Sequence, residues 1–332
     1  MIDNHPKINY GKTGLLLVNL GTPDSTSWWD IRKYLKEFLS DKRVIEVNPI
    51  LWKIILNLFI LNFRPSKTAK AYKEIWMKKE NMSPLRYYTL MQTKKVSEKM
   101  QNENLIIDFA MRYGNPSIEN KLRQLQQKGC ENIIVLPLYP QYAAATTATV
   151  CDEVYRTLMK MRWQPSLQII SHYESEPLYI DALVNSLEKK IDEINWKPDI
   201  ILASYHGIPK KYFEKGDPYH CYCQKTTRLI SEKFKKIPIK TTFQSRFGPQ
   251  EWLQPYTDKT LESLPKEGKS NILVICPGFS SDCVETLEEI SIQGKESFIS
   301  NGGKNFDLVP CLNDGEDHID LLIHLVKKYY TR

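Results

Sequence analysis

The sequence lacks the long apolar runs and phosphate-binding loops that define several large protein classes. No stretch reaches the roughly 18 uninterrupted apolar residues that a membrane-spanning helix needs, so the chain is not expected to cross a bilayer. Neither Gly-x-x-x-x-Gly-Lys-Ser/Thr nor Gly-x-Gly-x-x-Gly occurs, so no motif supports nucleotide binding. No linker rich in proline, glycine or serine divides the chain.

Paired cysteines are also missing. The seven cysteines form an odd, scattered set without a Cys-x-x-Cys pair, which is typical of a reduced, cytoplasmic chain. The segment His220-Cys221-Tyr222-Cys223 has no second ligand pair at zinc-finger spacing, so we expect it to be structural and free of metal. The N-terminal residues MIDNHPKINYGKTG contain no apolar core followed by a cleavage site, so no secretory signal is expected.

The composition that remains is that of an ordinary globular protein. The chain has 332 residues, of which 42% are hydrophobic and 26% charged, and this length is enough for two domains. The net charge of +7 comes from lysines and arginines that are dispersed rather than gathered in a stripe. A nucleic-acid partner is therefore not expected.

Short apolar runs alternate with helical segments along the whole chain, as in parallel sheets covered by helices. The runs are 14–20, 105–113, 132–138, 167–171, 200–205, 241–244, 271–276 and 306–309. The segments that begin at Val135 and Val274 both read strand, proline, aromatic, small residues, helix, which indicates a repeated unit. The predicted fold class is α/β, with two similar doubly wound domains, each a parallel sheet flanked by helices. Residues 1–165 with 311–332 are predicted to form the first domain and 166–310 the second.

Residues 50–63 form the most apolar stretch, interrupted only by one lysine and two asparagines. The stretch is too short to span a membrane, so it is either a buried helix or a segment that lies in a membrane surface. Arg64 and Lys67 follow directly, and a basic end on an apolar segment suits a membrane surface.

One predicted strand ends on a histidine. The buried run 200–203 is stopped by Gly207-Ile208-Pro209, which leaves His206 at the carboxyl end of the strand. Ligands bind at that edge in open parallel sheets, so His206 is a candidate acid, base or metal ligand. A structural histidine is the alternative.

Three carboxylates follow another predicted strand. Asp282, Glu285 and Glu289 stand at i, i+3 and i+7 of a helix expected to begin near Ser281, so they are predicted to share one face. Carboxylates in the first turns also suit a solvated helix N-terminus. Because His206 and Glu285 both follow strands that can share one sheet, they can face one cleft. Such a pair suits proton transfer or the passage of a hard or borderline cation.

Several motifs together carry a resemblance to a known family. They are, in order, NLGTPDS, LYPQYAAATT, SYHGIPKKYFEKGDPY, FQSRFGPQEWLQPYTD and CPGFSSDCVETLEEI. Over roughly residues 14–326 the chain resembles the ferrochelatases of Gram-negative bacteria, members of the class II chelatases. The resemblance implies the last step of heme synthesis, in which ferrous iron enters protoporphyrin IX and two protons are released. A related cobalt or siroheme-type tetrapyrrole chelatase and a heme- or porphyrin-binding carrier are the alternatives.

The resemblance also implies roles for individual residues. His206 and Glu285 correspond to the catalytic pair that accepts protons or binds iron, and Asp282 and Glu289 to further acidic positions on the path of the metal or of the protons. The expected substrate-binding residues are Arg64, Lys67 and Ser83 for the propionates, Arg112 and Tyr113 on the wall opposite His206, and Tyr139 in the cleft lining. The apolar stretch before Arg64 resembles a lip that touches the membrane, which implies a cytoplasmic protein peripheral to the inner membrane.

Two departures from the family pattern bear on metals. Cys283 stands where many relatives have histidine, so a route through two histidines does not transfer to this chain. No 2Fe-2S cluster is expected, because Ala144 occupies the internal cysteine position and no cysteine-bearing extension follows Arg332. Ferrous iron is expected as a substrate, together with protoporphyrin IX, and no prosthetic group is expected. The sequence does not indicate an oligomeric partner.

Overall fold

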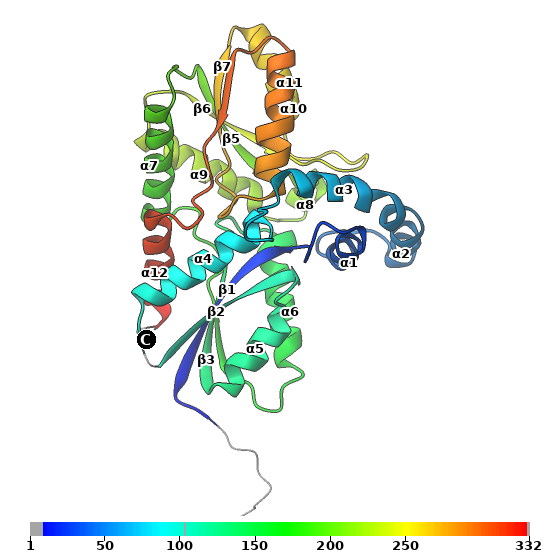
Figure 1. The fold of residues 1–332 in the computed structure, drawn as a ribbon, viewed down its shortest axis with the longest axis vertical. Helices are drawn as coiled ribbons and strands as arrows, with labels where there is room; N and C mark the ends of the chain where they lie inside the picture. Colours follow the sequence, from blue (N-terminus) through cyan, green and yellow to red (C-terminus); the bar gives the residue numbers. More distant parts are fainter. Residues whose placement is uncertain (1–8, 103, 331–332) are drawn as a thin grey trace, which may run out of the picture.

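The computed structural model describes residues 9–102 and 104–330, which form two halves, each built on a four-stranded parallel sheet (Figure 1). The first sheet has the order β2-β1-β3-β4, with β1 Lys12–Thr22, β2 Leu105–Gly114, β3 Cys130–Pro137 and β4 Ser166–Ile169. The second has the order β6-β5-β7-β8, with β5 Ile200–His206, β6 Ile239–Gln244, β7 Asn271–Ile275 and β8 Asn305–Leu308. The two orders are equivalent, so the prediction of two similar doubly wound domains is confirmed.

The helices cover both faces of the sheets and join the halves. They are α1 Trp28–Leu39, α2 Pro49–Ile55, α3 Leu61–Ile75, α4 Pro84–Lys99, α5 Ile118–Gln127, α6 Thr149–Leu158, α7 Pro177–Glu193, α8 Lys210–Glu214, α9 Tyr219–Lys233, α10 Thr257–Ser263, α11 Lys295–Ser300 and α12 Glu316–Tyr330. Three π-helical segments, η1 Leu56–Ile60, η2 Ala144–Ala148 and η4 Glu285–Gly294, and the 3-10 segment η3 Leu264–Glu267 complete the fold.

The strands are buried on both faces, as their continuous apolar runs predict. Leu15, Leu16 and Leu17 in β1 are fully buried. One apolar cluster contains Leu15 of β1, Ile201 of β5 and Leu322 of α12, so the two halves share a core. This shared core fixes how the carboxyl ends of the two sheets face each other.

The border between the halves differs from the predicted one. The boundary predicted at residue 165 separates β3 from β4, but β4 pairs with β3 in the first sheet, with Ile134 opposite Gln168. The first sheet therefore extends to Ile169. The C-terminal helix α12 packs on α4 and β3 of the first half and also on α7, and Figure 1 shows it at the junction of the two halves.

The apolar stretch 50–63 is not a buried helix, which corrects one of its two interpretations. It forms α2, η1 and the start of α3, which project from the body together with α1 (Figure 1). Leu56 and Leu61 pack inward, but most of its large apolar side chains are exposed, and Ile50, Leu58 and Phe63 are 74%, 60% and 75% exposed. No helix in residues 9–102 and 104–330 is long and apolar enough to cross a membrane.

Candidate active site

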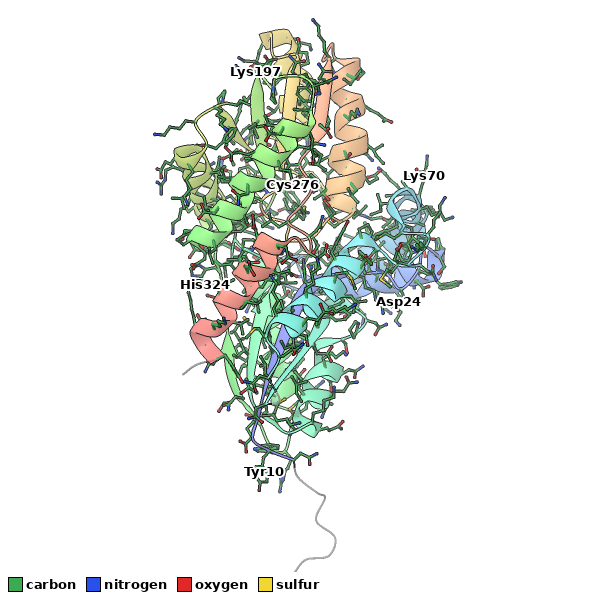
Figure 2. All side chains as sticks on the ribbon, turned by 60° about the vertical axis from the view of Figure 1, so that its left-hand side comes forward. Tyr10, Asp24, Lys70, Lys197, Cys276 and His324 are labelled. Atoms are coloured by element: carbon green, nitrogen blue, oxygen red, sulfur yellow. The ribbon has the colours of Figure 1, made fainter. Side chains whose placement is uncertain are left out.

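A cavity of about 400 Å³ lies where the carboxyl ends of the two sheets meet. Tyr139 and Thr146 of the first half line it, and His206, Glu285 and Glu289 of the second half face them. Figure 2 shows Cys276, which directly follows β7, near the middle of the molecule, where the halves join. The cavity continues into an outer hollow of about 960 Å³ along α1 and α3.

His206 is the last residue of β5, as the sequence predicts. Its Nδ1 lies 2.7 Å from the carbonyl oxygen of Gly207. Because a carbonyl only accepts, Nδ1 carries the hydrogen and a neutral ring offers its Nε2 lone pair. Gly207 has no room for a side chain, since a Cβ there would lie 2.9 Å from the carbonyl oxygen of Gln244. His206 is thus held as a group that can accept a proton or bind a cation.

The carboxylates of the second half lie on a π-helix rather than an α-helix. The hydrogen bonds of η4 run from i to i+5, which widens each turn, and π-helical segments occur frequently at functional sites. Glu285, Glu288 and Glu289 line the cavity from this segment. The first half has its own π-helical segment, η2, which follows β3 and contributes Thr146.

Asp282 does not share a helix face with the other carboxylates, which corrects the predicted spacing. It precedes the helix and is only 4% exposed. Its carboxylate accepts hydrogen bonds from Asn313 Nδ2 at 2.7 Å, Thr286 Oγ1 at 3.0 Å and the backbone N–H of Cys311 at 3.3 Å. Its contacts join the start of η4 to the loop 311–313 that follows β8, and it does not line the cavity.

Glu289 is held at the inner end of the cavity. Its carboxylate accepts from the backbone N–H of Ser245 at 2.7 Å and from the Ser245 hydroxyl. Burial raises the pKa of Glu289 above its ordinary value, against the lowering effect of the Ser245 hydrogen bonds and of nearby His206. Glu289 is therefore a carboxyl group suited to holding a proton.

Cys283 contributes a thiol to the wall of the cavity. Burial raises its pKa well above the ordinary value, and the neighbouring charge of Glu285 raises it further. The protonated thiol is a poor metal ligand. Within the part of the chain that the structure describes, no group of three or more His, Cys, Asp and Glu side chains is arranged to hold a metal ion.

The predicted substrate-binding residues fall into two groups. Arg64, Lys67 and Tyr139 line the cavity. The Arg64 guanidinium lies 4.5 Å from the centre of the Phe247 ring, across the opening between the halves. Across residues 9–102 and 104–330, neither Arg64 nor Lys67 is paired with a carboxylate. The opening thus carries unpaired positive charge.

The other three residues do not line the main cavity. Arg112 and Tyr113 both bind the carboxylate of Asp41, and Tyr113 donates to it at 2.9 Å. Tyr113 packs edge-on against Phe38, a cavity-lining residue, with ring centres 5.1 Å apart. Ser83 caps α4 by accepting from the backbone N–H of Arg86 at 3.2 Å. Of these three residues, Tyr113 thus contacts the cavity wall through Phe38.

The sequence interpretation missed several residues of the cavity wall. They are Asn19, Gln141, Thr146, Ser245, Phe247 and Glu288. A signal was present for Ser245 and Phe247, because they lie within three residues of the end of β6, at the carboxyl edge where ligands bind. The positions of Thr146 and Glu288 in the cavity wall depend on the π-helical turns. A π-helical turn produces no recognisable spacing of apolar residues, so the sequence did not predict these positions.

The fold is shared with solved chelatases. The structure of SirB from Bacillus subtilis with Fe³⁺ superposes with a TM-score of 0.58 at 10% identity, covering 96% of this chain and 95% of that one. CbiX, the terminal enzyme for siroheme biosynthesis in denitrifying bacteria, gives 0.51 at 10% identity, covering 95% and 99%. The two sheets and the cavity between them therefore define a two-domain chelatase fold.

Sequence comparison identifies the family. The family model Ferrochelatase matches residues 12–330. The ferrochelatase of Allorhizobium ampelinum is 54% identical over 327 residues, 98% of this chain and 95% of that protein. The ferrochelatase of Francisella tularensis is 52% identical over 321 residues, 96% of each. The chain belongs to the ferrochelatase family, and the prediction of a metal-chelating lyase of heme biosynthesis is confirmed.

Proposed function

We propose that this protein inserts ferrous iron into protoporphyrin IX in the cavity between its halves, forming heme and releasing two protons. The observation that carries the proposal is the position of His206, which uses Nδ1 for Gly207 and lines the same cavity as Glu285 and Glu289. Iron and porphyrin are both substrates, and neither needs a permanent site.

The residues match the steps of the reaction. Two pyrrole nitrogens must each lose a proton before they bind Fe²⁺. A neutral imidazole accepts a proton near neutral pH, so His206 is the proposed acceptor. Glu285 is the proposed ligand for the incoming cation, since carboxylate oxygen suits a borderline metal. Glu289, with its raised pKa, is the proposed next carrier of the proton.

The walls and the opening of the cavity match the macrocycle. Apolar side chains such as Phe38, Leu85 and Leu138 line it and can pack on a flat, apolar ring. Arg64 and Lys67 at the opening are the proposed partners of the two propionates. Binding energy from the propionates can support a bent ring, whose lone pairs point out of plane towards the metal.

The experiment for this proposal is the loss of protoporphyrin IX fluorescence with Fe²⁺ under anaerobic conditions, or with Zn²⁺, at enzyme concentrations far below that of porphyrin. We expect many turnovers per enzyme molecule. A porphyrin carrier would instead bind one equivalent without metalating it. Faster metalation of sirohydrochlorin than of protoporphyrin IX would favour the related tetrapyrrole chelatase.

We also propose that the projecting segment α2–η1–α3 touches a membrane surface, which would place the protein peripherally on the inner membrane. Its exposed apolar side chains are Ile50, Leu51, Ile54, Leu58, Phe59 and Phe63. Lysines stand beside this face, and Lys70, labelled in Figure 2, lies on the outer side of α3. An apolar face bordered by lysines suits an anionic bilayer, into which the apolar porphyrin also partitions.

Charge on the exposed apolar face should weaken membrane binding. We expect the double variant Leu58→Glu/Phe63→Glu to lower co-sedimentation with phosphatidylglycerol vesicles by about tenfold or more, since each side chain contributes about 2 kcal/mol of apolar burial. Met159→Glu is the matched control, because Met159 is 82% exposed but lies outside this segment, at the C-cap of α6. Equal binding of all three proteins would rule out this membrane contact.

A further inference from the structure

A second cavity, of about 10 Å³, lies beside Glu285. Tyr34 of α1, Tyr72 of α3 and Ser83 line it together with Glu285. Glu285 therefore forms part of the wall between this small cavity and the main one. A cavity needs roughly 10–15 Å³ and two or more polar partners to hold one water molecule, and this cavity has both.

Buried hydroxyl groups gather at this point. The Tyr72 hydroxyl faces those of Thr22 and Tyr34. Besides its hydrogen bond with Tyr72, the Tyr34 hydroxyl makes a long contact of 3.4 Å with the carbonyl oxygen of Gly21. Thr22 is 2% exposed, and its hydroxyl has no hydrogen bond of normal length within the described residues. Because a buried hydroxyl left unpaired is unfavourable, the Thr22 hydroxyl favours an ordered water beside the two tyrosines.

The two phenols stay neutral beside the carboxylate. Burial raises the pKa of Tyr72 far above its ordinary value, and the charge of Glu285 adds to the shift. Burial likewise raises the pKa of Tyr34, with smaller contributions from Tyr72 and Glu285. A neutral phenol next to a carboxylate is a hydrogen-bond donor to it, either directly or through a water.

We propose that Tyr72 is a positioning residue for Glu285: its O–H, through one water shared with Tyr34, holds the carboxylate from the side of the small cavity. The proposal rests on the proposed function of Glu285 in the main cavity. Tyr72 lies on α3, the helix that carries Arg64 and Lys67, whereas Glu285 lies on η4 of the other half. The single helix α3 thus carries the proposed propionate partners Arg64 and Lys67, and through Tyr72 it also positions Glu285.

The first test is Tyr72→Phe, which removes only the hydroxyl. We expect kcat for metalation to fall by about tenfold, the lower end of the range for residues that orient a metal ligand. The KM for protoporphyrin should not change, because the cavity walls and the opening remain intact. Tyr173→Phe is the matched control, since Tyr173 is a buried tyrosine whose hydroxyl has no hydrogen-bond partner in the described chain and which lines neither cavity. Thermal unfolding should show that both variants fold.

A double-mutant cycle with Glu285→Gln shows whether Tyr72 acts through Glu285. We expect Tyr72→Phe to have little further effect on kcat in the Glu285→Gln background. The same fall in both backgrounds, or no fall in either, would overturn the proposal.

The buried water gives a readout that does not depend on activity. A high-resolution crystal structure should show an ordered water between Tyr72 and Glu285 in the wild type and its loss or displacement in Tyr72→Phe. A dry cavity in the wild type would overturn the proposal even if metalation proceeds. Failure of metalation by the wild type would count against the proposed function, while the presence of the water would still support the link between Tyr72 and Glu285.

Discussion

Replacement of His206 by alanine is expected to lower kcat for metalation about 100-fold or more while protoporphyrin IX still binds. The ring is fixed by its Nδ1 hydrogen bond to Gly207, and Nε2 is the group proposed to receive the pyrrole protons. The nearby carboxyl groups are a poorer replacement, because the Glu289 carboxylate is already engaged by the backbone N–H and the hydroxyl of Ser245. The measurements are fluorescence loss for turnover and fluorescence titration without metal for porphyrin binding.

Two controls sharpen this test. His324→Ala removes an imidazole from α12 that pairs with Glu176 far from the cavity, and it should leave kcat unchanged. Added imidazole should partly restore turnover to His206→Ala by entering the space that the side chain leaves. Wild-type turnover by His206→Ala would show that the carboxylates alone remove the protons.

Replacement of Asp282 by alanine is expected to give the largest loss of stability, about 3 kcal/mol in the free energy of unfolding. The buried carboxylate accepts from Asn313, Thr286 and the backbone N–H of Cys311, and removing it leaves buried donors without partners. Urea unfolding of the wild type and the variant gives the difference directly.

Asp282→Asn separates this structural role from a role in metal passage. The amide keeps one acceptor oxygen, so we expect a smaller loss of stability than with alanine. Because Asp282 does not line the cavity, kcat per folded molecule should stay near the wild-type value. Unchanged stability together with a fall in kcat would instead support the role in metal passage that the family resemblance implies for Asp282.

The strands and the placement of His206 could be read from the sequence because they depend on neighbouring residues. The run 200–205 was predicted as a strand, and β5 covers Ile200–His206. Burial on both faces leaves a continuous apolar run, and Gly207 with Pro209 ends it, so the histidine stands at the carboxyl edge. The position of β4 could not be read, because pairing partners are chosen between strands distant in the sequence.

The cavity-lining carboxylates could be predicted only in part from the residues next to them in the sequence. An α-helical spacing was assumed for Asp282, Glu285 and Glu289, but Asp282 precedes the helix, and the π-helix η4 adds Glu288 to the cavity wall beside Glu285 and Glu289. The Asp282 carboxylate accepts a hydrogen bond from Asn313, which lies in a loop distant in the sequence, and it does not line the cavity. The support of Glu285 by Tyr72 joins segments from opposite halves and leaves no local pattern.

The sequence by itself determined the family, the repeated α/β order and the histidine at the end of β5, because these depend on composition, on short-range pattern and on motifs that stay in order. The tertiary structure decided which carboxylates line the cavity and which tyrosines lie beside Glu285. Those relations depend on packing between segments far apart in the chain, and a single sequence carries no local trace of such contacts.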